Sequence, residues 1–167
     1  MTTIFFIGDD HEKDGTITAG TLIFSEFGFN PEKDNYILLL ESEEDNGDKG
    51  FIPKTDYEIE LAVILDQKPK GKDSATLRSL MNNSDNNVYG FDNNKPTFSV
   101  ARQNQQRKSL QKYVTKNKDT KGALYYVIVV GAAHLEPRTD VKGWVVLQNN
   151  EGDFYGSNCQ IAVNIPD

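Results

Sequence analysis

Apolar and polar residues alternate with a period of two along two segments of this chain, 57–65 and 159–165. A period of two places successive side chains on opposite faces of an extended backbone, so it predicts half-buried β-strands. Two other segments, 36–40 and 124–133, are almost continuously apolar. Polar, turn-forming residues flank both segments, and each segment has the length of a strand. These apolar segments therefore predict strands that are buried on both faces.

Four further segments predict strands, at residues 3–7, 16–24, 97–101 and 142–147. Turn-forming pairs such as Asp14-Gly15 separate the apolar runs, because glycine adopts the left-handed backbone angles that strand residues resist. Many short strands joined by such turns are typical of an antiparallel β-sandwich or flattened barrel. We therefore expect a mainly β fold, with an α+β arrangement as the alternative.

Two segments have the character of helices. Asp73 or Ser74 can cap a helix that runs through Met81, and residues 102–115 are rich in good helix formers. Both lie in a polar part of the chain that contains little strand pattern. We expect one β-rich domain over residues 1–167, with a helical or irregular insertion at about 67–121.

Composition narrows the classes of function. The chain has 167 residues, a formal net charge of -7 and a single cysteine, Cys159. One cysteine excludes an intramolecular disulfide. The acidic balance argues against nucleic acid as a partner, because binding to nucleic acid requires cations that neutralise phosphates. The first residues lack the basic segment of a Sec-type signal peptide, and no run is long enough to span a membrane, so we expect a cytoplasmic or particle-associated protein.

Charge is sorted by position along the chain. Between residues 26 and 48, eight acids face one base, Lys33. Between residues 102 and 121, seven bases face one acid, Asp119. Complementary segments on one molecule indicate contact within the fold or between copies. The residues expected to carry this contact are the bases Arg102, Arg107, Lys108, Lys112 and Lys116 and the acids Glu41, Glu43, Glu44, Asp45 and Asp48.

These features favour a non-enzymatic structural or assembly protein whose copies associate through the acidic segment 26–48 and the basic segment 102–121. A component of a virion, a tail or a secretion apparatus would fit this pattern. The hypothesis fails in this form if the two segments pair within one molecule. The alternative is a β-sandwich module that binds a small ligand, a glycan or calcium, with Trp144 able to stack on a sugar.

Candidate metal ligands are few. Asp45 and Asp48 lie in an acidic turn that offers the oxygen ligands calcium prefers, although the EF-hand spacing is missing. His11 and His134 could contribute to a transition-metal site in a metal-dependent enzyme, but their spacing matches no established ligand motif. No nucleophile motif or phosphate-binding glycine loop occurs, so no catalytic residue and no cofactor other than calcium is expected.

Overall fold

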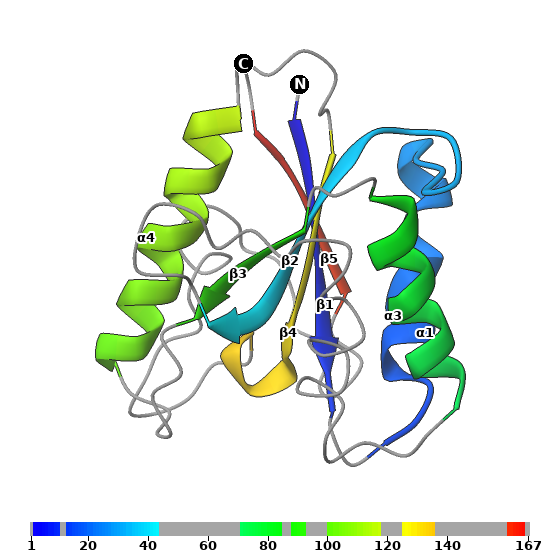
Figure 1. Cartoon of the computed structure of the whole chain (residues 1–167), viewed down its shortest axis with the longest axis horizontal. Coiled ribbons are helices and arrows are strands. Elements are labelled where there is room, and N and C mark those ends of the chain that lie inside the picture. Colours follow the sequence, from blue (N-terminus) through cyan, green and yellow to red (C-terminus); the bar gives the residue numbers. More distant parts are fainter. Residues whose placement is uncertain are drawn as a thin grey trace.

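The structure is a computed structural model that describes residues 2–10, 13–43, 71–84, 88–92, 100–117, 125–135 and 160–165. Within these ranges a twisted sheet lies between two layers of helix (Figure 1). The elements in chain order are β1 (Thr2–Asp9), α1 (Thr16–Gly20), η1 (Thr21–Ile23), η2 (Ser25–Phe27), β2 (Tyr36–Glu43), α3 (Lys72–Asn83), β3 (Val88–Asp92), α4 (Val100–Asn117), β4 (Tyr125–Gly131), η4 (Ala132–His134) and β5 (Gln160–Ile165).

The sheet has the strand order β3-β2-β4-β1-β5. The strands β1, β2, β3 and β4 are parallel to their neighbours, whereas β5 runs antiparallel to β1 at one edge. Register is continuous across the centre, where Phe5 of β1 lies opposite Val127 of β4, and Val127 lies opposite Leu38 of β2. This is an α/β arrangement in which helices connect parallel strands.

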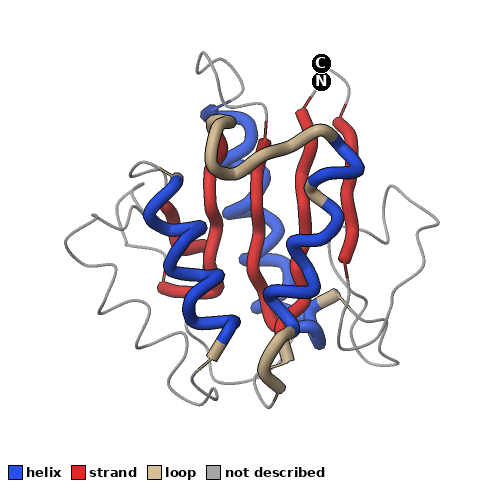
Figure 2. Tube along the Cα trace, turned by 90° about the vertical axis from the view of Figure 1, so that its right-hand side faces the viewer, coloured by secondary structure: helices blue, strands red, loops and turns tan. Residues whose placement is uncertain are grey.

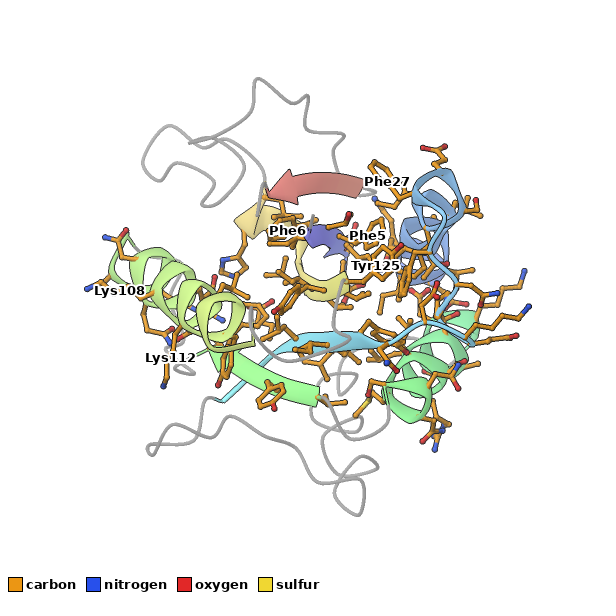
Figure 3. The ribbon with its side chains drawn as sticks, turned by 90° about the horizontal axis from the view of Figure 1, so that it is seen from above. Phe5, Phe6, Phe27, Lys108, Lys112 and Tyr125 are labelled. Carbon is orange, nitrogen blue, oxygen red and sulfur yellow. The ribbon has the colours of Figure 1, made fainter. Side chains whose placement is uncertain are left out.

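Each face of the sheet carries its own apolar core. Phe5 and Phe6 are adjacent in β1, are fully buried and point to opposite faces (Figure 3). Phe5 packs with α1, α3 and the aromatic rings of the 24–36 segment. Phe6 packs in the core beneath α4, which contains Leu110 and Tyr113. The two helical layers therefore bury both faces, as a parallel sheet requires.

The helices form where apolar residues recur at helical spacing. In α3, Leu77, Leu80 and Met81 are buried against the sheet, and Figure 2 shows the helical layer on this side in front of the strands. In α4, the buried stripe includes Gln106, Ser109, Leu110 and Tyr113. Because two of these four residues are polar, α4 covers a face that is partly polar, and its apolar pattern is weak.

Short helix α1 packs closely against β1. A Cβ atom at Gly20 would overlap the side chain of Ile7, so only glycine allows this approach. The preceding turn is also set by glycine, because Gly15 adopts φ 91° immediately before α1 begins. These two glycines explain how a segment rich in β-branched residues folds as helix.

The expected antiparallel β-sandwich is wrong. The sheet is mostly parallel. The expected insertion at 67–121 contains β3, which is a strand of this sheet, and the helices α3 and α4, which cover its two faces. The strands expected at 3–7, 36–40 and 159–165 are confirmed by β1, β2 and β5, and the two expected helices by α3 and α4. The strand expected at 124–133 is confirmed by β4, except that residues 132 and 133 belong to η4. The strand expected at 16–24 is instead α1 and η1, and residues 100 and 101 of the expected strand 97–101 begin α4. The segments 57–65 and 142–147 lie outside the described residues.

Candidate functional site at the carboxyl edge of the sheet

Two adjacent central strands send the chain to opposite faces of the sheet. After β1 the chain enters α1, whose Ile17 belongs to the core with Phe5. After β4 it enters η4, and Leu135 directly beyond η4 belongs to the core with Phe6. In open α/β sheets this divergence opens a crevice at the carboxyl ends of the strands, where ligands commonly bind. The polar residues at this edge therefore form the candidate site.

Glu41, near the carboxyl end of β2, is the centre of the first half of the site. Its Oε1 atom accepts hydrogen bonds from Nη2 of Arg102 at 2.8 Å and from Nε2 of His134 at 2.9 Å. Its Oε2 atom accepts a hydrogen bond of 2.7 Å from the backbone N–H of Gly131, the last residue of β4. A single carboxylate thus connects β2, β4, η4 and α4.

The pKa of Glu41 reflects these contacts. Burial alone would raise it, because a low-dielectric surrounding disfavours the charged form. The hydrogen bond and positive charge offered by His134, the Gly131 amide and the charge of Arg102 act in the opposite direction and hold the pKa below its ordinary value of 4.5. Glu41 is therefore a carboxylate at neutral pH.

Arg102, in the first turn of α4, joins Glu41 to β3. Its Nε and Nη2 atoms donate to the two oxygens of Asp92 at 3.1 and 2.6 Å, a bidentate contact. Burial alone would lower the pKa of Arg102, but the hydrogen bonds and charge of Asp92, together with the charge of Glu41, raise it. Two carboxylates thus surround one guanidinium in a setting where Asp92 is only 3% exposed.

Gln106, one helical turn after Arg102, adds a buried acceptor to this network. Its Nε2 atom donates to Asp92 Oδ1 at 3.1 Å, which fixes the orientation of the amide, because a carboxylate can only accept. The Oε1 atom of the same amide is buried and has no hydrogen-bond partner within the described part of the chain. A buried carbonyl oxygen of this kind accepts a donor from water or ligand at little cost.

The second half of the site lies across β1, at Asp9, its last residue. Thr16 Oγ1 lies 2.7 Å from Oδ1 of Asp9 and 3.3 Å from Oδ2 of Asp73. Asp9 and Asp73 are both buried, at 3% and 1% exposure. The two carboxylates are thus drawn to one hydroxyl, which has a single proton to donate.

Asp73 also caps α1 from a distant part of the chain. Its two oxygens accept the backbone N–H groups of Thr16 and Thr18 and the hydroxyl of Thr18. In return, Asp14, just before α1, accepts the backbone N–H of Asp73 in the first turn of α3. Asp73 thus lies at the start of α1 and Asp14 at the start of α3, so carboxylates already occupy the two helix N-termini, where the partial positive charge would otherwise attract an anion.

The described residues at this edge have an excess of negative charge. The acids are Asp9, Asp10, Asp14, Glu41, Asp73 and Asp92, and the bases are Lys13, Lys72 and Arg102. Lys13 pairs with Asp10 at 3.0 Å on the surface. In the network around Arg102, two carboxylates, those of Glu41 and Asp92, contact one guanidinium.

The residues that were expected to form a contact between copies lie in different environments in the structure. Glu41 and Arg102 pair with each other inside one chain. Lys108 is exposed on α4, and Lys112 is partly buried there. Arg107 and Lys116 lie on α4 and Glu43 at the end of β2, but their side chains are outside the description, and Glu44, Asp45 and Asp48 lie outside the described residues altogether.

The expected metal ligands are not brought together in what the structure describes. His134 is buried beside Glu41, while His11 and the calcium candidates Asp45 and Asp48 lie outside the described residues. Among the side chains that are described, no group of three or more His, Cys, Asp or Glu is arranged to hold a metal ion. None of the helices in the described ranges is both long and apolar enough to cross a membrane.

Sequence reasoning missed Asp92 and Gln106 as members of a site. Asp9 and Asp92 each end an apolar strand, which is the signal that marks the carboxyl edge of a parallel sheet. That signal has no meaning in an antiparallel sheet, where strand ends alternate between the two edges. Gln106 has no comparable signal, because only the packing of α4 on β3 shows that it is buried.

A separate hollow lies on the α3 side, away from this edge. It is an open groove of about 800 Å³ between α3 and residues 21–32, with Phe24, Phe29 and Leu80 in its lining and Glu32 among its polar residues.

Comparison of the chain with protein-family models, with curated proteins and with solved structures finds no match.

Proposed function

We propose that this protein is a binding module that takes a small cationic ligand at the carboxyl edge of its parallel sheet. The observation that supports this most directly is the contact of Arg102 with two carboxylates, Glu41 and the buried Asp92, beside the divergence of β1 and β4. Buried ion networks contribute little net stability, because desolvation offsets most of their attraction. The network of Glu41, Arg102 and Asp92 lies at the edge where α/β sheets commonly bind ligands, so a role in binding explains why it is there.

The chemistry of the edge favours a cation with N–H donors. The network places the carboxylates of Glu41 and Asp92 around one guanidinium, and the buried Oε1 atom of Gln106 is an acceptor without a partner in the described residues. An ammonium or guanidinium group supplies both a positive charge and several donors. An anion such as phosphate is disfavoured, because Asp73 and Asp14 occupy the positions at the N-termini of α1 and α3 that phosphates use.

The direct test is a melting-temperature screen at constant ionic strength. The cationic probes are agmatine, putrescine and methylguanidine, and the matched anionic probes are adipate and inorganic phosphate. Ligand at ten times its dissociation constant stabilises the folded state by about 1.4 kcal/mol, which corresponds to roughly 3–5 °C in a chain of this size. We expect at least one cationic probe to produce this rise and both anions to produce none.

Two variants connect a rise to the site. Gln106→Met removes the buried acceptor and should abolish the response to the cation, whereas Glu32→Gln, which removes a distant exposed carboxylate, should leave it intact. If the cationic rise disappears equally in both variants, the probe binds the acidic surface at large. Equal rises with cations and anions would contradict the proposal.

A further inference from the structure

His134 is a titratable side chain at the carboxyl edge to which the proposed function gives no role. It ends η4, the short helical turn that follows β4, and η4 lies at the same edge of the sheet as the end of β2 (Figure 1). Leu135, the next residue, is fully buried in the core beneath α4, and His134 itself is 4% exposed. The buried Leu135 therefore holds the imidazole in place beside Glu41.

The contact with Glu41 fixes which ring nitrogen of His134 carries a proton. Nε2 of His134 lies 2.9 Å from Oε1 of Glu41, and a carboxylate can only accept a hydrogen bond, so Nε2 donates. The neutral imidazole with its proton on Nε2 makes this bond, and so does the imidazolium. His134 can therefore change its charge without losing its contact with Glu41.

The charged groups that the structure describes around His134 come from three elements. Glu41 of β2 contacts it directly, Arg102 of α4 shares the same Oε1 atom, and Asp92 of β3 contacts Arg102. From β4, the backbone N–H of Gly131 donates to the other oxygen of Glu41. A proton on His134 thus places a second positive charge against a carboxylate that already contacts a guanidinium.

The strand β1 also packs against η4. Its Phe6 belongs to the core on this side of the sheet, whereas Asp9 lies on the other side and accepts the hydroxyl of Thr16. Asp10, just beyond β1, pairs with Lys13 on the surface. The acids at the end of β1 therefore have partners in α1 and in the turn before it.

Glu41 and Arg102 keep their charges near neutral pH. Burial would raise the pKa of Glu41, but its contacts with His134, Gly131 and Arg102 hold it below 4.5. Burial would lower the pKa of Arg102, but Asp92 and Glu41 raise it. Histidine is the residue type that ordinarily changes its charge between about pH 5 and pH 8. Mild acid therefore changes the charge around Glu41 through the histidine.

We propose that cation binding at the carboxyl edge is linked to loss of a proton from His134, so that the protein binds its ligand near pH 8 and releases it in mild acid. This linkage rests on the proposed function, because it concerns the same carboxylates. A bound cation and an imidazolium repel each other near Glu41, whereas the neutral imidazole does not oppose the cation. Linkage is reciprocal, so a ligand that favours neutral His134 must release protons when it binds.

The test measures agmatine binding to the full chain by isothermal titration calorimetry, at constant ionic strength. The ammonium and guanidinium of agmatine both stay protonated between about pH 5.5 and about pH 8.5. The dissociation constant should rise about tenfold from the higher to the lower pH, a typical strength for two coupled sites. Titrations in two buffers of different ionisation enthalpy should show release of up to about one proton per agmatine.

Two histidine variants assign the proton. His134→Gln keeps an N–H donor for Glu41 but gains no charge in this pH range, so the two dissociation constants should become equal. His11→Gln is the matched control, because the chain has two histidines, and it should keep the tenfold change and the proton release. If His134→Gln does not fold, proton release that persists in His11→Gln assigns the proton to His134, and its loss contradicts that assignment.

The possible failures are distinguishable. Agmatine that binds wild type equally well at both pH values would overturn the proton linkage and leave the proposed function standing. A tenfold change that persists in His134→Gln would also overturn the linkage, because another group would then carry the proton. Agmatine that binds at neither pH would overturn both proposals.

Discussion

Glu41 and Arg102 are separated by 61 positions in the chain, yet Oε1 of Glu41 lies 2.8 Å from Nη2 of Arg102. Glu41 lies in the central strand β2, and Arg102 lies in α4, the helix that connects β3 to β4. Their contact holds the start of α4 over the carboxyl edge of the sheet. The acidic segment 26–48 and the basic segment 102–121 therefore form at least one ion pair within the molecule.

Removal of the guanidinium should strongly destabilise the fold. In Arg102→Ala, the buried carboxylate of Asp92 and the largely covered carboxylate of Glu41 lose their common partner. Breaking a buried ion pair in this way typically costs about 3–5 kcal/mol. Urea denaturation at pH 7 measures the loss. Lys108→Ala is the control, and because its side chain is exposed on the same helix, it should change stability by less than about 0.5 kcal/mol.

Glu41 should contribute to stability above its ordinary pKa and not in acid. Its folded-state pKa lies below the value of 4.5, so the unfolded chain takes up a proton first as the pH falls. The contribution is complete above about pH 5 and is lost as the pH falls through the folded-state pKa. Urea midpoints from pH 7 to pH 3 should fall less steeply for Glu41→Gln than for wild type. Parallel profiles would show that Glu41 is not stabilised as a carboxylate.

Tyr126 should tolerate loss of its hydroxyl. Its oxygen is buried without a hydrogen-bond partner among the residues described, so Tyr126→Phe should keep or raise the free energy of unfolding, by up to about 1 kcal/mol. Tyr36→Phe is the matched comparison, because the Tyr36 hydroxyl donates to the Leu80 carbonyl at 2.6 Å. That variant should lose about 1 kcal/mol. Equal effects of the two substitutions would contradict the assignment.

The same tyrosine should also ionise late. Burial, assisted by the neighbouring Tyr89, raises the pKa of Tyr126 to about 12. Ultraviolet titration should therefore show an absorbance change near pH 12 in wild type that is missing in Tyr126→Phe. If the two titrations coincide above pH 11, Tyr126 is accessible to solvent.

The carboxylate caps should differ in their importance. Asp73 is 1% exposed and accepts the backbone N–H groups of Thr16 and Thr18, so Asp73→Ala removes the acceptor of both and should cost at least about 2 kcal/mol. Asp14 is exposed and accepts one backbone N–H, so Asp14→Ala should cost about 1 kcal/mol. Chemical denaturation of the two variants gives this order. The reverse order would contradict the reciprocal capping of α1 and α3.

The periodicity of apolar residues located most of the helices and strands, but it did not show that neighbouring strands run parallel. The fully apolar runs that became β2 and β4 are buried on both faces, which is itself typical of parallel strands. Turn-rich flanks favoured an antiparallel arrangement instead, although the helices predicted at 73–81 and 102–115 are the crossovers α3 and α4 that parallel strands require. A strand was also expected at residues 16–24, a segment that contains several β-branched residues. Packing of Gly20 on Ile7 overrides that propensity.

The candidate site could be predicted only in part. Glu41, Arg102 and His134 were identified by charge or by residue type, but as parts of separate hypotheses, since their meeting depends on strand order. Asp92 ends β3, ten positions before Arg102, and the pattern did not predict a strand at residues 88–92. The partnership of these residues therefore depends on the tertiary fold rather than on any local pattern.

Binding of a cation at the carboxyl edge is tested most directly by mapping it with backbone amide NMR. Agmatine is titrated into the ¹⁵N-labelled chain at constant ionic strength, with adipate as the control. The account predicts saturable shift changes that are largest at the amides of Asp9, Asp92 and Gly131, which lie at the ends of β1, β3 and β4. No saturable change, or changes confined to the exposed acids Glu26 and Glu32, would contradict it.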